Sequence, residues 1–180
     1  MRRYIAFLRG INVGGNRVVK MEVLRKLFEE LGLEGVKTYI QSGNVFFDAD
    51  ADPQKLEAQI APHLHTALGF QVPVYIRTVE EVDSLLEFPL FCDKEPGENE
   101  RYLVLFTAEK VTVPKKLPLT SAKGDCEIVG VGKKEVFVRY FVTNGRPADP
   151  TKLVSVTFGD IQTTGRFFHT LKKIVTAAKA

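Results

Sequence analysis

The stretch VKTYIQSGNVFF, residues 36–47, predicts two β-strands joined by a tight turn. Strands are expected at 36–41 and 44–47, because β-branched and aromatic residues dominate both runs. Ser42-Gly43 is expected to form the hairpin turn, since glycine tolerates the positive φ that such turns require. The elements on either side of this hairpin define the first half of the chain.

A strand and a helix are predicted on each side of the hairpin. Residues 4–8 form an apolar strand pattern, and apolar residues then recur at helical spacing over 21–31. After the hairpin, Asp52 followed by proline is a typical helix start, and Pro62 is expected to kink or split that helix. A strand over 72–77 completes a β-α-β-β-α-β order, the ferredoxin-like arrangement.

The second half is predicted to be a degraded copy of this architecture with a C-terminal helix. A strand at 101–106, a hairpin of strands at 126–131 and 135–142, and a helix start at Asp149 support this prediction. The last helix is expected over 166–178. The predicted fold class is therefore α+β with two ferredoxin-like halves. The expected domains are a ferredoxin-like half at 1–87, a connecting segment at 88–100 and a second α+β half at 101–180.

Length and composition are those of an ordinary folded protein. The 180 residues are 44% hydrophobic and 26% charged. No apolar run approaches the ~18 residues that a membrane span requires, and no secretory signature is recognised, so we expect a cytoplasmic protein without a membrane partner. Cys92 and Cys126 lack CxxC spacing and are expected to be buried, inert thiols. No metal site or cofactor is expected, because no cluster completes a coordination set.

Positive charge is concentrated towards both ends of the chain, although the net charge is only +3. The first twenty residues contain five Lys or Arg residues and no acid, and residues 160–180 carry a net charge of +3. This asymmetry favours an anionic partner if the two ends meet in space. Charge that is scattered over a solvated surface is the alternative.

Residues 9–20 form a long, glycine-containing loop after the first strand. Because the first two strands of a β-α-β-β-α-β unit run the same way, this loop and the Ser42-Gly43 turn are expected at one sheet edge. Glycine amides there approach a ligand closely, and cations and neutral polar groups surround them. The predicted ligand-binding residues are Arg9, Asn12, Gly14, Gly15, Asn16, Arg17, Ser42 and Asn44, with Arg166 from the start of the last helix.

These groups suit a phosphate, a phosphodiester or a carboxylate, so a module that binds a small anion or phosphate-bearing ligand is the leading hypothesis. The loop matches neither the P-loop nor GxGxxG, and a purely structural loop is an alternative. An enzyme acting on a phosphoester or nucleotide at this site is another alternative, as is an RNA-binding protein. For Arg166, an internal salt bridge competes with a bound anion, because a cation opposes the helix dipole there.

Several segments resemble a bacterial family, domain of unknown function family 1697. The matches are R-G-I-N-V-G-G at 9–15, Met21, and T-Y-I-Q-S-G-N-V at 38–45. Near the C-terminus, Phe167 and Phe168 stand where the family pattern has Asn and Trp, so Phe167 is given no polar role. The resemblance implies an α+β fold with ferredoxin-like halves, and it implies no activity.

Overall fold

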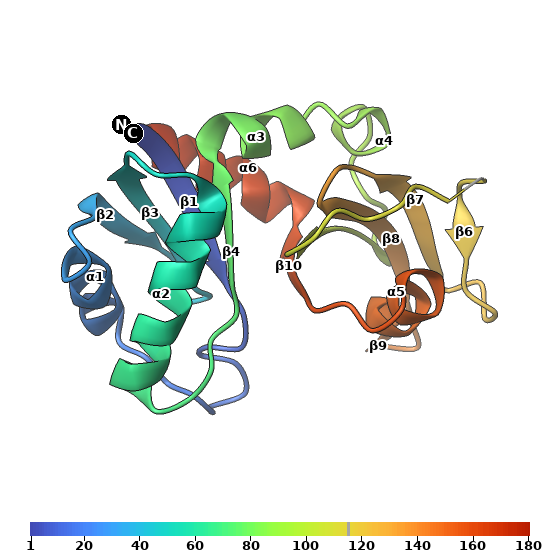
Figure 1. The fold of residues 1–180 in the computed structure, drawn as a ribbon. Helices are drawn as coiled ribbons and strands as arrows, with labels where there is room; N and C mark the ends of the chain where they lie inside the picture. The colour runs from blue at the N-terminus through green and yellow to red at the C-terminus, as the bar shows by residue number, and fades with distance from the viewer. Residues whose placement is uncertain (115) are drawn as a thin grey trace. The chain divides into compact units, whose positions relative to one another are not determined.

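The computed structural model describes residues 1–114 and 116–180, which form two compact units (Figure 1). The first unit contains Met1–Leu85 and Lys173–Ala180, and the second unit contains Leu86–Lys172. Helices and antiparallel strands are mixed in the chain, so the fold is α+β, as the sequence predicts. None of the helices in the described residues has the length and apolar character needed to cross a bilayer.

The first unit has the β-α-β-β-α-β order expected from its sequence. Its elements in chain order are β1 (Arg2–Leu8), α1 (Met21–Glu29), β2 (Glu34–Tyr39), β3 (Asn44–Ala49), α2 (Pro53–Leu68), β4 (Val74–Thr78) and α3 (Val79–Leu85). The strands lie in the order β2-β3-β1-β4, and all neighbours are antiparallel. Since β3 lies between β1 and β2, these two strands run in the same direction.

The core of the first unit lies between one face of its sheet and helices α1 and α2 (Figure 1). On β1, Tyr4, Ala6 and Leu8 belong to this core, because alternate strand residues share a face. Full burial of a large apolar side chain contributes about 1.5–3 kcal/mol. The helices bury apolar residues at helical spacing, Leu24, Leu27 and Phe28 on α1 and Leu56, Ile60 and Leu64 on α2.

Helix α2 begins where the sequence predicts and then runs on through its internal proline. The Asp52 carboxylate accepts a hydrogen bond from the Lys55 amide at 3.2 Å, which caps the helix start. The helix is not split at Pro62. Ile60 and Leu64, on either side of the proline, are fully buried, so core packing outweighs the lost backbone hydrogen bond.

The second unit repeats this strand order, and its described residues contain no helix in the first crossover, between residues 107 and 126. Its elements are α4 (Pro89–Cys92), β5 (Glu100–Thr107), β6 (Leu119–Thr120), β7 (Cys126–Val131), β8 (Glu135–Thr143), β9 (Arg146–Pro147), α5 (Pro150–Phe158), β10 (Thr163–Phe167) and the start of α6 (Phe168–Lys179). The strand order is β10-β5-β8-β7-β6, and β9 pairs with β8. Thus β5, β7, β8 and β10 have the same relative order as β1, β2, β3 and β4, while β6 lies in the first crossover.

The last helix begins later than expected. Thr163–Phe167 forms strand β10, which pairs with β5, and α6 starts at Phe168. Arg166 therefore lies on a strand opposite Val104 and not in the first turn of a helix, so the helix dipole does not act on it as predicted. The helix after Asp149 forms as expected.

Aromatic side chains fill part of the second unit. Phe91 is buried and its ring stacks on that of Tyr102, with centroids 4.3 Å apart. Phe88 stacks on Phe137 at 4.1 Å. A Cβ atom at Gly130 would lie 2.6 Å from the Phe88 ring, so this position on β7 has room only for glycine.

Candidate functional site

The predicted ligand loop forms a small β-hairpin after β1. The Asn16 amide donates a hydrogen bond to the Val13 carbonyl at 3.2 Å, which closes the hairpin tip. Gly14 and Gly15 occupy the tip with φ values of 60° and 76°, as a type I′ turn requires. The hairpin geometry accounts for both glycines, and ligand contact by their amides stays a prediction.

Asn12 ties this hairpin to the turn between β2 and β3. Its Nδ2 donates to the carbonyl oxygens of Val19 (3.0 Å) and Gln41 (2.9 Å), and its Oδ1 accepts from the Val19 amide (2.8 Å). The structure thus brings together the loop and the turn that the sequence placed at one edge. Because both amide hydrogens are used, Asn12 positions the backbone, and direct ligand contact by Asn12 stays a prediction.

The connection between β2 and β3 has four residues instead of the expected two, because β2 ends at Tyr39. Ile40 has a φ of 51°, which a β-branched residue rarely adopts, and its side chain is exposed. Gly43 has a φ of 76°, and a Cβ atom there would lie 2.9 Å from Leu8 Cβ. The Leu8 amide also donates to the Gly43 carbonyl at 2.8 Å, so the backbone of the turn lies too close to β1 for a side chain at residue 43.

Asn44 and Ser42 close this turn. Asn44 is fully buried, and its Nδ2 donates to the Tyr39 carbonyl (3.1 Å) and to Ser42 Oγ (3.0 Å). Ser42 itself is exposed. The predicted site residues therefore divide into buried or half-buried asparagines that hold the backbone and groups that face solvent.

Three cations supply the positive charge of this edge, and all three are exposed. The Arg17 guanidinium lies over the Phe70 ring, 5.3 Å from its centroid. Burial raises the pKa of Tyr75, and the charge and hydrogen bond of the nearby Arg9 oppose this rise. Within the described part of the chain, Arg9, Arg17 and Lys20 form no ion pair with a carboxylate.

Arg166 is a buried residue of the second unit. Its Nη1 donates to Thr164 Oγ1 (3.0 Å) and to the Gly165 carbonyl (2.8 Å). Burial lowers the pKa of Arg166 to about 10, so its guanidinium keeps a positive charge at neutral pH. Arg166 belongs to a different unit from Arg9 and Ser42, and a site shared by these residues stays a prediction.

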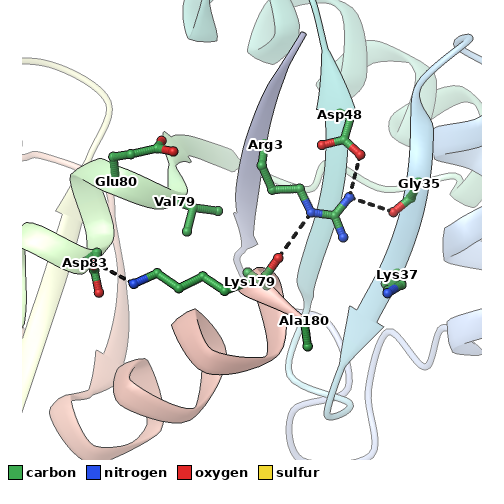
Figure 2. A pocket seen from close by; sticks show the side chains of 10 residues that line it. Arg3, Gly35, Lys37, Asp48, Val79, Glu80, Asp83, Lys179 and Ala180 are labelled. Carbon is green, nitrogen blue, oxygen red and sulfur yellow. Dashed lines mark hydrogen bonds and ion pairs between the residues drawn. The ribbon is translucent and has the colours of Figure 1, made fainter.

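A hollow in the first unit, with a volume of about 510 Å³, lies where β1 begins. Figure 2 shows the Arg3 guanidinium reaching across the sheet from β1. It donates to Asp48 Oδ2 (2.8 Å), the Gly35 carbonyl (2.9 Å) and the Ala178 carbonyl (3.3 Å). The hollow therefore lies at the opposite end of β1 from the ligand loop, which follows Leu8.

The charges of this hollow are largely neutralised within it. Asp48 accepts from Arg3, and Asp83 Oδ2 accepts from Lys179 Nζ at 2.7 Å (Figure 2). An anion or a cation alone thus gains little there. No sequence motif marks this hollow, because its residues come from separate strands and helices.

The comparisons with known proteins agree with the fold and name no activity. No curated protein is significantly similar to the chain. A solved structure, the conserved bacterial protein SP0830 from Streptococcus pneumoniae, is 28% identical, covers 100% of this chain and 99% of its own, and has a TM-score of 0.75. The model of the family described as "Protein of unknown function (DUF1697)" matches residues 1–137. The chain therefore belongs to the DUF1697 family.

Proposed function

We propose that the first unit binds an anionic, phosphate-bearing ligand at its loop edge, which we define as residues 9–20 and 40–43. One observation carries this proposal. Arg9, Arg17 and Lys20 are exposed there, without a carboxylate partner in the described residues, on a backbone that the Asn12 side chain holds in place. Cations without a carboxylate partner attract an anion. Because the loop is already fixed, the anion costs less conformational entropy to bind there than on a mobile surface.

The strained backbone of the loop edge supports a binding role. Among the described residues, four residues other than glycine have a left-handed φ, and three of them lie here: Asn12 (54°), Arg17 (51°) and Ile40 (51°). Such residues cost about 1–3 kcal/mol each and persist only where the surroundings hold them. A loop that is already fixed loses little conformational entropy when it binds a ligand.

The sheet topology also supports the proposal. The order β2-β3-β1-β4 corresponds to a ferredoxin-like sheet, in which β1 and β2 end at the same edge. The hairpin follows β1 and the turn follows β2, so the cations of the first segment and the exposed Ser42 of the second belong to the same edge of the sheet. An arginine guanidinium presents several fixed donors to phosphate oxygens, and a serine hydroxyl adds another.

Backbone NMR of the full chain, titrated with inorganic phosphate and then pyrophosphate, tests the proposal. We expect amide shifts concentrated in residues 9–20 and 40–43. The double variant Arg9→Gln/Arg17→Gln should bind pyrophosphate at least tenfold more weakly, because each hydrogen bond to a charged group contributes about 1.5–3 kcal/mol. The proposal is wrong if millimolar pyrophosphate shifts no amide of the loop edge.

Arg146 provides a matched control. It is exposed and follows the turn at Asn144 and Gly145, whose φ values of 51° and 72° resemble those at the hairpin tip. Arg146→Gln removes one arginine charge from the same kind of turn in the second unit, so it is matched to the single variant Arg17→Gln. We expect this variant to bind pyrophosphate like the unaltered protein. If it lost as much affinity as a loop-edge variant, pyrophosphate would be attracted by positive charge anywhere on the surface.

A further inference from the structure

Tyr102 carries a buried hydroxyl group without a hydrogen-bond partner among the described residues. The residue is only 3% exposed, and its ring is held by stacking on Phe91. Burial raises the pKa of Tyr102, so the hydroxyl keeps its proton and remains a donor. Phenylalanine would pack the same ring without an unsatisfied polar atom, so the hydroxyl points to a partner outside the chain.

Tyr102 lines a small cavity of the second unit, which we call the aromatic pocket. Its volume is about 30 Å³, enough for one or two non-hydrogen atoms of a ligand. The pocket therefore accepts a small polar substituent and not a whole ring. Its lining comprises Phe91, Glu95, Pro96, Arg101, Tyr102, Phe167, Phe168, His169 and Lys172.

An aromatic platform lies beside the aromatic pocket. Phe167 is 38% exposed, and its ring is nearly parallel to that of the exposed His169, with centroids 5.7 Å apart and an interplanar angle of 10°. Exposed rings of this kind are stacking surfaces for nucleobases, and each stacked base contributes about 1–3 kcal/mol. The platform is suited to the flat face of a heterocycle.

Two cations of the aromatic pocket favour a negatively charged ligand. Lys172 Nζ lies 5.2 Å from the Phe168 centroid and 3.7 Å from Glu95 Oε1. The side chains of Lys172 and Glu95 are 43% and 83% exposed, so their ion pair is weak and both can move aside without disturbing the core. Arg101 is fixed by donating to the carbonyls of Glu98 and Glu100, both at 2.8 Å.

We propose that the aromatic pocket binds a nucleoside monophosphate. The base stacks on Phe167, an acceptor on the edge of the base enters the pocket and receives a hydrogen bond from Tyr102, and the phosphate lies near Lys172. This site belongs entirely to the second unit and does not rest on the loop edge.

Isothermal titration calorimetry of the full chain with AMP, UMP and ribose 5-phosphate tests this inference. We expect at least one nucleotide to bind about tenfold more tightly than ribose 5-phosphate, because only the nucleotides bring a base to the platform. Tyr102→Phe should weaken nucleotide binding about three- to tenfold, the loss of one neutral hydrogen bond. The inference is overturned if neither nucleotide binds better than ribose 5-phosphate, or if Tyr102→Phe leaves the affinity unchanged.

Two substitutions at Phe167 separate stacking from simple apolar contact. Phe167→Tyr keeps an aromatic face and should retain nucleotide binding, whereas Phe167→Leu keeps apolar bulk and should lose about tenfold. Equal nucleotide affinities of these two variants would contradict the proposal that a base stacks on Phe167. A phosphate bound at the loop edge contributes equally for a nucleotide and for ribose 5-phosphate, so the preference for the nucleotide, and its loss in Phe167→Leu, report the aromatic pocket alone. Failure of the loop-edge proposal and failure of this one are therefore distinguishable.

Discussion

The first strand of each sheet leads into a different kind of connection. In the first unit, β1 is followed by a hairpin and helix α1 before β2. In the second unit, the described residues between β5 and β7 form the short β6 and no helix. The relative strand order is nevertheless the same. The comparison shows that this strand order does not require a helix in the first crossover, which needs only to cover apolar surface.

The two units also differ in where backbone and side chains are constrained. The loop edge of the first unit is fixed by left-handed residues and the Asn12 amide. A turn of similar backbone conformation at Asn144 and Gly145 in the second unit is exposed, with open space around the glycine. Substitution of the same residue type in both units therefore separates two effects on the free energy of unfolding. One is the strain of a left-handed backbone, which both turns share, and the other is the loss of tertiary contacts, which only the loop edge makes.

Gly43→Ala should give the largest effect, a loss of about 3 kcal/mol or more in the free energy of unfolding. The new methyl group adds left-handed strain and collides with Leu8 and Ile11. Gly145→Ala adds only the strain, about 1–2 kcal/mol, because nothing lies within 4 Å. Urea unfolding measures both values, and equal losses would show that the turn at Gly43 is not closely packed.

Asn12→Ala should lower the free energy of unfolding by about 2–3 kcal/mol, since three hydrogen bonds are lost and the Val19 amide loses its acceptor. Asn144→Ala, at a residue with nearly the same φ, should cost about 1 kcal/mol or less. The same unfolding measurement tests the pair. If Asn144→Ala lowered the free energy of unfolding as much as Asn12→Ala, the loss would come from the left-handed φ and not from the hydrogen bonds of Asn12.

Removal of one hydroxyl from each unit should change stability in opposite directions. Tyr4 and Tyr102 are both buried, but the Tyr4 hydroxyl donates to the Ala51 carbonyl at 2.7 Å, and that of Tyr102 has no partner in the described chain. Tyr4→Phe should therefore destabilise by about 1 kcal/mol and Tyr102→Phe should stabilise by about 1 kcal/mol. Thermal unfolding gives both signs, and destabilisation by Tyr102→Phe would contradict the assignment.

The smallest effect concerns the two thiols of the second unit. The expectation that both are buried is wrong for Cys92, which is exposed, whereas Cys126 is buried. Burial raises the pKa of Cys126 to about 12, so almost no thiolate forms at pH 8. A disulfide reagent should modify one thiol per folded chain, at a rate that rises with pH as Cys92 ionises. Two rapidly modified thiols in the native protein would contradict this prediction.

Local patterns predicted much of the fold. The β-branched and aromatic residues in 36–47 and the helix start at Asp52 are local signals, and the two strands and the helix that they predict formed. Strand β10 was missed because Thr163 and Thr164 look like helix caps, while their strand conformation depends on pairing with β5, more than fifty residues earlier. Tertiary pairing overrides local propensity in such segments.

The closeness of two segments was predicted, whereas the contacts between them were not. The sequence placed the loop and the Ser42-Gly43 turn together, and the hydrogen bond from Asn12 to Gln41 bears this out. A structural loop was one of the alternatives, but the particular backbone groups that Asn12 binds, and the left-handed φ of Ile40, could not be told from neighbouring residues. Contacts between residues 29 positions apart depend on how the chain packs, which local patterns do not encode.

The hydrogen bonds of Asn12 have a consequence for protein engineering. They join two surface segments into one rigid insert, although the segments are encoded almost thirty codons apart. Lengthening the hairpin or replacing the turn separately would break the junction and release both segments. Transfer of this surface to another scaffold therefore requires both segments together, with an asparagine between them.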